Sequence, residues 1–141
     1  MNWDQFEKGI FLVNLLGIIY NPQTKRILIG KRENDLYLQN LSWVFPGGRA
    51  NYKDELESSL DKEIIAKTGL NVDIKMAVFA KTYPEKREFL SIYYYCETTS
   101  IDEFKAGGSI TELKWVKPSE VQNYFTTSLH PTLLKYLQTL E

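Results

Sequence analysis

The residues best suited to chemistry lie in one stretch, residues 43–70, which reads WVFPGGRANYKDELESSLDKEIIAKTGL. A proline and two glycines predict a tight turn, and a charged helix follows the turn and ends at a glycine. Glycines let the backbone come close to a ligand, and they can leave a carbonyl oxygen such as that of Gly47 pointing into a cleft. Carboxylates at positions i, i+3 and i+4 share one helical face and can hold a hard cation such as magnesium. Glu63 stands at such a position, but Ala66 and Lys67 stand where its two partners would be.

Glu63 therefore has two interpretations. It could bind a cation or position a water molecule. It could instead form an ion pair with Lys67, because one helical turn separates the two residues in the favourable acid-first order. An exposed pair of this kind contributes ~0.3–0.5 kcal/mol. We favour the ion pair over the metal ligand.

The elements that must position these residues follow from hydrophobic periodicity and from turn signals. The patterns predict strands over residues 10–20, 26–32 and 42–45, a helix over 54–68, strands over 72–83, 88–98 and 109–116, and helices over 118–125 and 131–140. Residues 34–40 read as a polar loop. In the first helix Leu56, Leu60 and Ile64 form an apolar stripe, and Gly69 supplies a C-terminal cap. This order predicts an α/β fold, a mixed β-sheet with helices on both faces.

The composition is that of a single globular domain over residues 1–141, with 43% hydrophobic and 25% charged residues. The formal net charge is -1, from 17 basic and 18 acidic side chains. Because no broad positive surface is expected, the chain has no electrostatic support for nucleic-acid binding. Any recognition of phosphate must come from a few placed cations.

The chain contains one cysteine, Cys96, and one histidine, His130. These numbers exclude a disulfide within the chain and leave too few ligands for a structural zinc site. Cys96 lies in an apolar run and is expected to be a buried, inert thiol, and His130 before Pro131 reads as the start of a helix. The first residues include acids and no cationic leader, and no apolar run approaches the ~20 residues of a membrane span. We therefore expect a cytoplasmic protein that does not enter a membrane.

Residues 48–70 resemble the signature of Nudix hydrolases, G-x5-E-x7-R-E-U-x-E-E-x-G-U, in which U is aliphatic. The match has no gap, and the box positions are taken in order by Gly48, Asp54, Lys62, Glu63, Ile64, Gly69 and Leu70. Ala66 and Lys67 fall where the family has its paired metal-binding glutamates. The preceding W-x-x-P-G-G and the later ELKWV at residues 112–116 are also Nudix-like. The resemblance implies a Nudix-type α/β/α sandwich, magnesium as cofactor, and attack of water on a diphosphate or sugar-phosphate linkage.

Within that family, the run LIGKRENDLYLQNLSWVFPGGR is most similar to GDP-mannose mannosyl hydrolases. The resemblance implies that Arg32 and Arg49 contact the diphosphate of the substrate, for which guanidinium groups have suitable geometry. That branch tolerates alanine at position 66, but it keeps a glutamate at the position of Lys67. Its catalytic histidine would fall near Ile110 here, so the chemistry of the branch is not carried over.

The expected site contains Glu63 as catalytic residue and metal ligand, the Gly47 carbonyl as a second contact to weakly bound Mg2+, and Arg32, Arg49 and Lys67 as contacts to the substrate. The ammonium of Lys67 would take the position of magnesium. The expected function is that of a Nudix-family hydrolase relative that binds, and at most weakly hydrolyses, a nucleoside diphosphate linked to another moiety such as a sugar. An inactive ligand sensor and a protein-interaction module remain alternatives. Nudix relatives often dimerise, which leaves a homodimer open.

Overall fold

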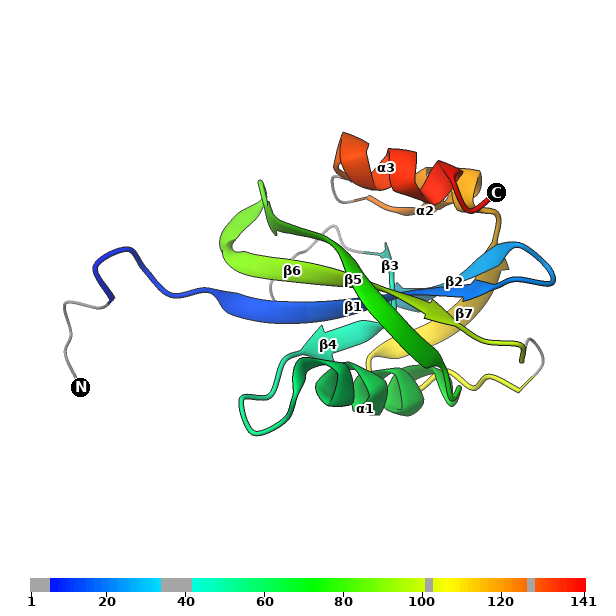
Figure 1. Cartoon of the computed structure of the whole chain (residues 1–141), viewed down its shortest axis with the longest axis horizontal. Helices are drawn as coiled ribbons and strands as arrows, with labels where there is room; N and C mark the ends of the chain where they lie inside the picture. Colours follow the sequence, from blue (N-terminus) through cyan, green and yellow to red (C-terminus); the bar gives the residue numbers. More distant parts are fainter. Residues whose placement is uncertain (1–5, 34–41, 101–102, 127–128) are drawn as a thin grey trace.

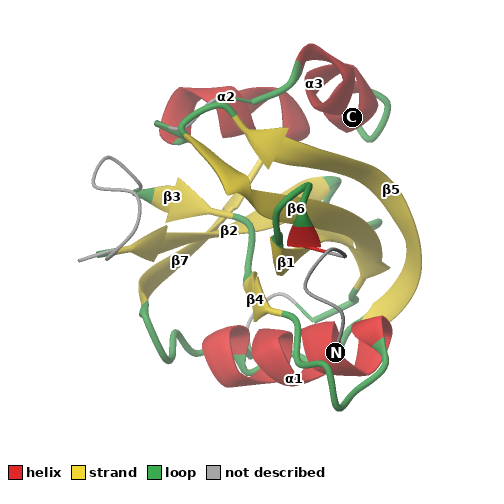
Figure 2. Ribbon diagram, turned by 90° about the vertical axis from the view of Figure 1, so that its left-hand side faces the viewer, coloured by secondary structure: helices red, strands yellow, loops and turns green. Residues whose placement is uncertain are grey.

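The computed structural model describes residues 6–33, 42–100, 103–126 and 129–141. The predicted loop over 34–40 lies outside the described residues. In chain order the elements are β1 (Leu12–Asn21), β2 (Arg26–Arg32), β3 (Trp43–Val44), β4 (Gly47–Arg49), α1 (Leu56–Thr68), β5 (Asp73–Tyr83), β6 (Lys86–Glu97), β7 (Ile110–Val116), the 3-10 turn η2 (Pro118–Glu120), α2 (Val121–Tyr124) and α3 (Pro131–Gln138). Helix α1 covers one face of the sheet, and α2 and α3 cover the other (Figure 2). The predicted α/β/α arrangement is confirmed.

The described strands form one mixed sheet in the order β3-β2-β1-β6-β5, with β4 paired to β1 and β7 paired to β2. Strand β1 runs parallel to β6, and the other pairs of described strands are antiparallel. The first half of β1 pairs with β4 and its last three residues pair with β2, so β2 and β4 follow one another along the same edge of β1. Between them, the Gly17 N–H donates to the Pro46 carbonyl at 2.8 Å. This contact holds the start of β4 against β1, and β4 lies beside α1 (Figure 1).

Two of the predicted elements need correction. The Pro-Gly-Gly segment was expected to be a turn, but Gly47–Arg49 forms the short strand β4 on β1. Gly47 allows β4 to lie close to β1, because a Cβ at this position would overlap the Leu15 carbonyl oxygen. Residues 118–125 were expected to be one helix, and they form a 3-10 turn followed by the short helix α2. The other bounds differ from the predicted ranges by one or two residues, as is usual at frayed ends.

The core consists of one apolar cluster on each side of the sheet, as alternation along β1 requires. Leu15 and Ile19 face α1, whereas Ile18 and Tyr20 face α2 and α3. The predicted stripe of α1 is only partly right. Its residues 60 and 64 are fully buried, but Leu56 is 41% exposed, so the first turn of the helix lies outside the core.

The last turn of α1 is closed by its cap and by the segment before β7. Gly69 has a φ of 72°, and its N–H donates to the Ile65 carbonyl at 2.9 Å, as expected for a glycine cap. The N–H of Lys105 donates to the Thr68 carbonyl at 2.8 Å. The N–H of Gly107 donates to the carbonyl of residue 67 at 3.1 Å. These bonds satisfy terminal carbonyls of α1 and hold the segment against the last turn of the helix.

Candidate functional site

The centre of the candidate site is the side chain of Lys67. Its Nζ lies 3.2 Å from Oε2 of Glu63 and donates a hydrogen bond to the carbonyl oxygen of Gly47. The predicted ion pair between Glu63 and Lys67 is therefore confirmed. The structure also adds a contact between residues that lie 20 positions apart in the chain. The ammonium thus touches both groups that were expected to bind a metal ion.

Gly48 and Gly108 lie against the side chains of this arrangement. A Cβ at Gly48 would lie 2.5 Å from the carboxylate of Glu63, and a Cβ at Gly108 would lie 3.5 Å from Cγ of Lys67. The side chain of Lys67 is 16% exposed and that of Glu63 is 36% exposed. Because the ammonium is mostly covered and has two oxygen partners, its position is far better defined than that of a surface lysine. The contribution of the Gly107-Gly108 pair was missed, although a Gly-Gly dipeptide is a turn signal.

A second ion pair holds the segment before α1. Nζ of Lys62 lies 3.2 Å from Oδ1 of Asp54. The N–H of Asn51 donates to Oγ of Ser59 at 2.9 Å. These contacts keep the connection between β4 and α1 in place, so the charged pair of Glu63 and Lys67 faces the backbone of β4.

The residues present at this position do not fit a resident divalent cation. Ala66 offers no side-chain donor, and Lys67 places a positive charge on the two remaining oxygen ligands. Throughout the described part of the chain, no three His, Cys, Asp or Glu side chains gather as a metal site would require. Magnesium needs several oxygen ligands in near-octahedral geometry, and an ammonium at hydrogen-bonding distance excludes that geometry.

The two arginines lie on opposite faces of the sheet. Alternation along β2 places Arg32 on the face that α1 covers, and Arg32 is paired in register with Ile110, whose N–H donates to the Gly107 carbonyl at 3.0 Å. Arg49 ends β4 on the other side. Its Nε donates to Oδ1 of Asn14 at 3.0 Å, and its guanidinium lies 5.4 Å from the centre of the Phe89 ring. The structure therefore brings Gly47, Glu63 and Lys67 together and places the arginines on opposite faces of the sheet.

The cysteine and the histidine do not meet. Cys96 is buried in the cluster beneath α1, and burial raises the pKa of its thiol to about 12. His130 caps α3, where its Nδ1 accepts a hydrogen bond from the N–H of Thr132 at 3.1 Å. These positions confirm the expected inert thiol and the expected helix start.

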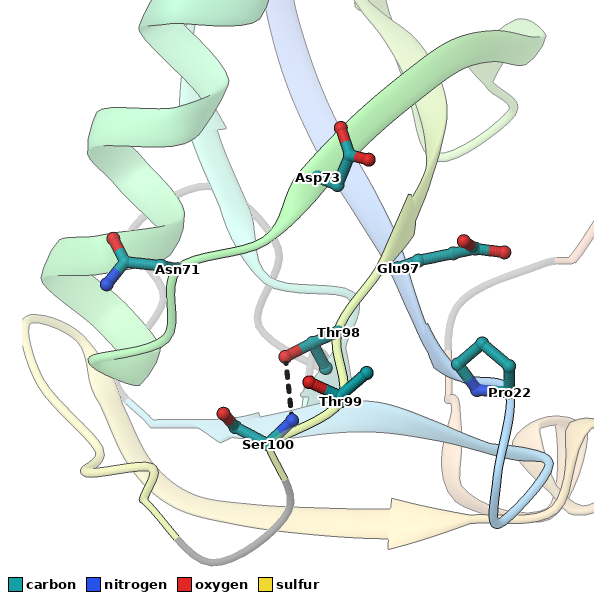
Figure 3. A pocket seen from close by; sticks show the side chains of 7 residues that line it. All are labelled: Pro22, Asn71, Asp73, Glu97, Thr98, Thr99 and Ser100. Atoms are coloured by element: carbon teal, nitrogen blue, oxygen red, sulfur yellow. Dashed lines mark hydrogen bonds between the residues drawn. The ribbon is translucent and has the colours of Figure 1, made fainter.

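A surface hollow of about 300 Å3 lies where β5 begins and β6 ends, beside the C-terminal end of α1 (Figure 3). It is lined by Pro22, Asn71, Asp73, Glu97, Thr98, Thr99 and Ser100. Asp73 is paired with Lys75 at 2.6 Å, and Glu97 accepts a hydrogen bond from the Tyr95 hydroxyl at 2.6 Å. Because its lining contains two carboxylates and no cation, this hollow does not suit phosphate.

The family follows from the box, the fold and the sequence comparison together. The model of the NUDIX domain matches residues 11–138, and the chain therefore belongs to the NUDIX domain family. Enzymes of this family generally use divalent metal ions. No curated protein matches the sequence of this chain. None of the described helices is long and apolar enough to span a membrane.

Solved structures with the same fold share little sequence with this chain. The MutT protein of Methanosarcina mazei Go1 has a TM-score of 0.71 and 18% identity, over 93% of each chain. The NUDIX domain of Shewanella oneidensis NrtR, complexed with ADP ribose, has a TM-score of 0.70 and 15% identity, over 99% of this chain and 98% of its own. A bifunctional NMN adenylyltransferase/ADP ribose pyrophosphatase of Francisella tularensis, complexed with AMP and a manganese ion, has a TM-score of 0.73 and 16% identity, over 96% of this chain and 44% of its own. At these identities the likeness establishes the fold.

Proposed function

We propose that this NUDIX domain binds a nucleoside diphosphate linked to a further group, and that it hydrolyses the ligand weakly or not at all. The observation that supports this proposal is the position of the Lys67 ammonium between the Gly47 carbonyl and Glu63. In this proposal the ammonium supplies the positive charge that a metal ion supplies in active relatives. The cytoplasm, where nucleotide derivatives are abundant, is the proposed location.

The chemistry of an ammonium separates binding from cleavage. A divalent ion neutralises phosphate charge and also generates a reactive metal-bound hydroxide. An ammonium carries a single charge and lowers the pKa of no bound water. Glu63, which could act as a base, is held in the ion pair with Lys67. Phosphate affinity is thus retained, and the attacking nucleophile is lost.

Arg32 and Arg49 are the proposed further contacts to the diphosphate. Guanidinium groups bind phosphate oxygens through paired N–H donors, whereas Lys67 acts as a point charge. Because Arg32 lies on the face of the sheet that α1 covers and Arg49 lies on the opposite face, the two arginines would contact a diphosphate at Lys67 from different sides of β4.

The test is a thermal-shift titration with ADP-ribose, AMP and GDP-mannose, with 5 equivalents of EDTA in one arm and excess magnesium in the other. ADP-ribose and AMP are the ligands of the two related structures described above. We expect a stabilisation of about the same size in both arms, because the cation is part of the protein. A Lys67→Met variant should lose the shift, while Lys135→Met, on the exposed side of α3, should keep it.

Two results would contradict the proposal. One is a shift that appears only with magnesium, together with rapid release of product. The other is no shift with any of the three ligands, which would favour an interaction module.

A further inference from the structure

A row of polar residues crosses four strands on the side of the sheet opposite α1. Strand register pairs Arg49 of β4 with Asn14 of β1, Asn14 with Ser91 of β6, and Ser91 with Lys81 of β5. Side chains that face one another across a strand pair lie on the same face of the sheet. We call these four residues the polar row. Its members come from positions 14, 49, 81 and 91 and are brought together only by the fold.

The polar row lies just beyond the region that α3 covers. The adjacent row contains Tyr93 and Phe79, whose rings lie 6.0 Å apart, and Phe79 contacts His130 at the start of α3 at 5.1 Å. The paired strands β5 and β6 extend past that end of α3 (Figure 1). The polar row therefore lies on the sheet just past the N-terminal end of α3.

Each end of the polar row has a cation set against an aromatic ring. The guanidinium of Arg49 lies 5.4 Å from the centre of the Phe89 ring, and Nζ of Lys81 lies 4.1 Å from the centre of the Tyr83 ring. Such contacts hold a cation in a defined direction. Burial lowers the pKa of Lys81, and the nearby carboxylate of Glu85 acts in the opposite direction. At ~4.8 Å per strand, the Cα atoms of Arg49 and Lys81 lie about 14 Å apart across the four strands.

The centre of the polar row holds a polar group that lacks a partner. Ser91 is 0% exposed, and its Oγ has no hydrogen-bond partner among the residues that the structure describes. Buried hydroxyls are normally hydrogen-bonded, and each exception calls for a reason. An oxyanion that enters between Arg49 and Lys81 and displaces the atoms covering Ser91 would supply the missing acceptor.

We propose that the polar row is a second oxyanion site, which binds a phosphate group of the ligand beyond the one held at Lys67. This inference rests on the proposed function. Strand β4 connects the two sites, because its Gly47 carbonyl meets Lys67 and its Arg49 begins the polar row. A ligand that passes around β4 can contact both. The preferred ligand therefore carries a further phosphate, and a neutral sugar in its place binds less tightly.

The experiment measures the binding of ADP and ATP, which differ by one phosphate, by isothermal titration calorimetry in the presence of EDTA. We expect wild type to bind ATP about tenfold more tightly than ADP, as one additional charge-assisted contact implies. Lys81→Gln and Ser91→Ala should abolish that tenfold preference and leave ADP affinity unchanged. Lys75→Gln is the matched control, since Lys75 lies on the same strand and is paired with Asp73 at 2.6 Å, outside the polar row. Lys67→Met should weaken the binding of both nucleotides.

The outcomes separate the two proposals. If the ATP preference persists in Lys81→Gln and Ser91→Ala, the second site is wrong, whatever Lys67→Met does. If Lys67→Met binds both nucleotides normally while the preference depends on Lys81, the second site stands and the Lys67 site is wrong. Backbone amide shifts of wild type with inorganic triphosphate provide a measurement without any variant. Shifts at residues 14, 81 and 91 support the site, and their absence at saturation overturns it.

Discussion

At the scale of single residues, Lys67 decides the character of the site. Its ammonium contacts both the Gly47 carbonyl and the carboxylate of Glu63. The side chain of residue 67 thus places a cation between the two oxygen groups that were expected to bind a metal ion. The neighbouring Ala66 is exposed, so a longer side chain has room there.

The double change Ala66→Glu and Lys67→Glu should create a divalent cation site. Three carboxylates would then lie on one face of α1 near the Gly47 carbonyl, which is a suitable set of hard oxygen ligands. We expect manganese binding, measured by calorimetry, to rise at least tenfold over wild type. Unchanged manganese affinity in a folded double variant would show that the backbone of β4 no longer has the geometry of a metal site.

Glu63→Gln distinguishes an ion-pair partner from a metal ligand. Loss of the partly exposed pair should lower the free energy of unfolding by about 0.5–1 kcal/mol, measured by urea titration. Magnesium-independent ligand binding should persist, because Lys67 keeps its charge. Loss of a magnesium-dependent activity in this variant would instead assign Glu63 to metal binding.

At the scale of elements, the site depends on close contact between α1, β4 and the segment before β7. A Cβ at Gly107 would overlap the backbone carbonyl of Ala66, and backbone cannot rotate away. A Cβ at Gly48 would instead meet the end of the Glu63 side chain, which can move. The absence of a Cβ at Gly107 therefore avoids a clash with the backbone of α1, whereas its absence at Gly48 leaves space for the side chain of Glu63.

Gly107→Ala should destabilise the protein by about 1–3 kcal/mol, as overpacking usually does, and Gly48→Ala should cost less. Gly48→Ala should nevertheless displace Glu63 from Lys67 and alter ligand affinity. Urea titration and calorimetry of the two variants check both statements. Equal destabilisation would contradict the contrast between backbone and side-chain contacts.

At the scale of the whole molecule, the two apolar clusters bury the residues on both faces of the sheet and keep them out of contact with solvent. Cys96 is 0% exposed beneath α1, so its thiol reports on opening of the entire domain. Its neighbours in the run, Tyr93 and Tyr94, are 2% and 4% exposed. Both are buried although they point to opposite faces, because helices cover both sides of the sheet.

Cys96 should resist thiol reagents at pH 8 until the protein unfolds. In urea, labelling by Ellman's reagent should follow the same transition as the far-UV circular dichroism. Because burial raises the pKa of the thiol from 9.0 to about 12, the unfolded state loses this proton first. The stabilisation from Cys96 is therefore complete below pH 9 and is lost as the pH rises toward 12. Labelling well before the transition would reveal local opening of β6.

Local patterns in the sequence were sufficient for much of the fold. Alternation predicted β2 over its observed range, the turn signals predicted the hairpin of β5 and β6, and Gly69 marked the end of α1. These features depend on residues that are close in the chain. The spacing of the box likewise predicted the family and the ion pair between Glu63 and Lys67, since one helical turn sets their separation.

The contacts that give the site its character depended on the tertiary structure. Only the fold brings the Gly47 carbonyl to Lys67. Pairing with β1 makes residues 47–49 a strand where the sequence predicted a turn. Strand register also places Arg32 and Arg49 on opposite faces of the sheet. Strand register, which is a relation between distant segments, also assembles the polar row. Sequence periodicity assigns a residue to a face of its own strand, but it does not say which residue of another strand lies beside it.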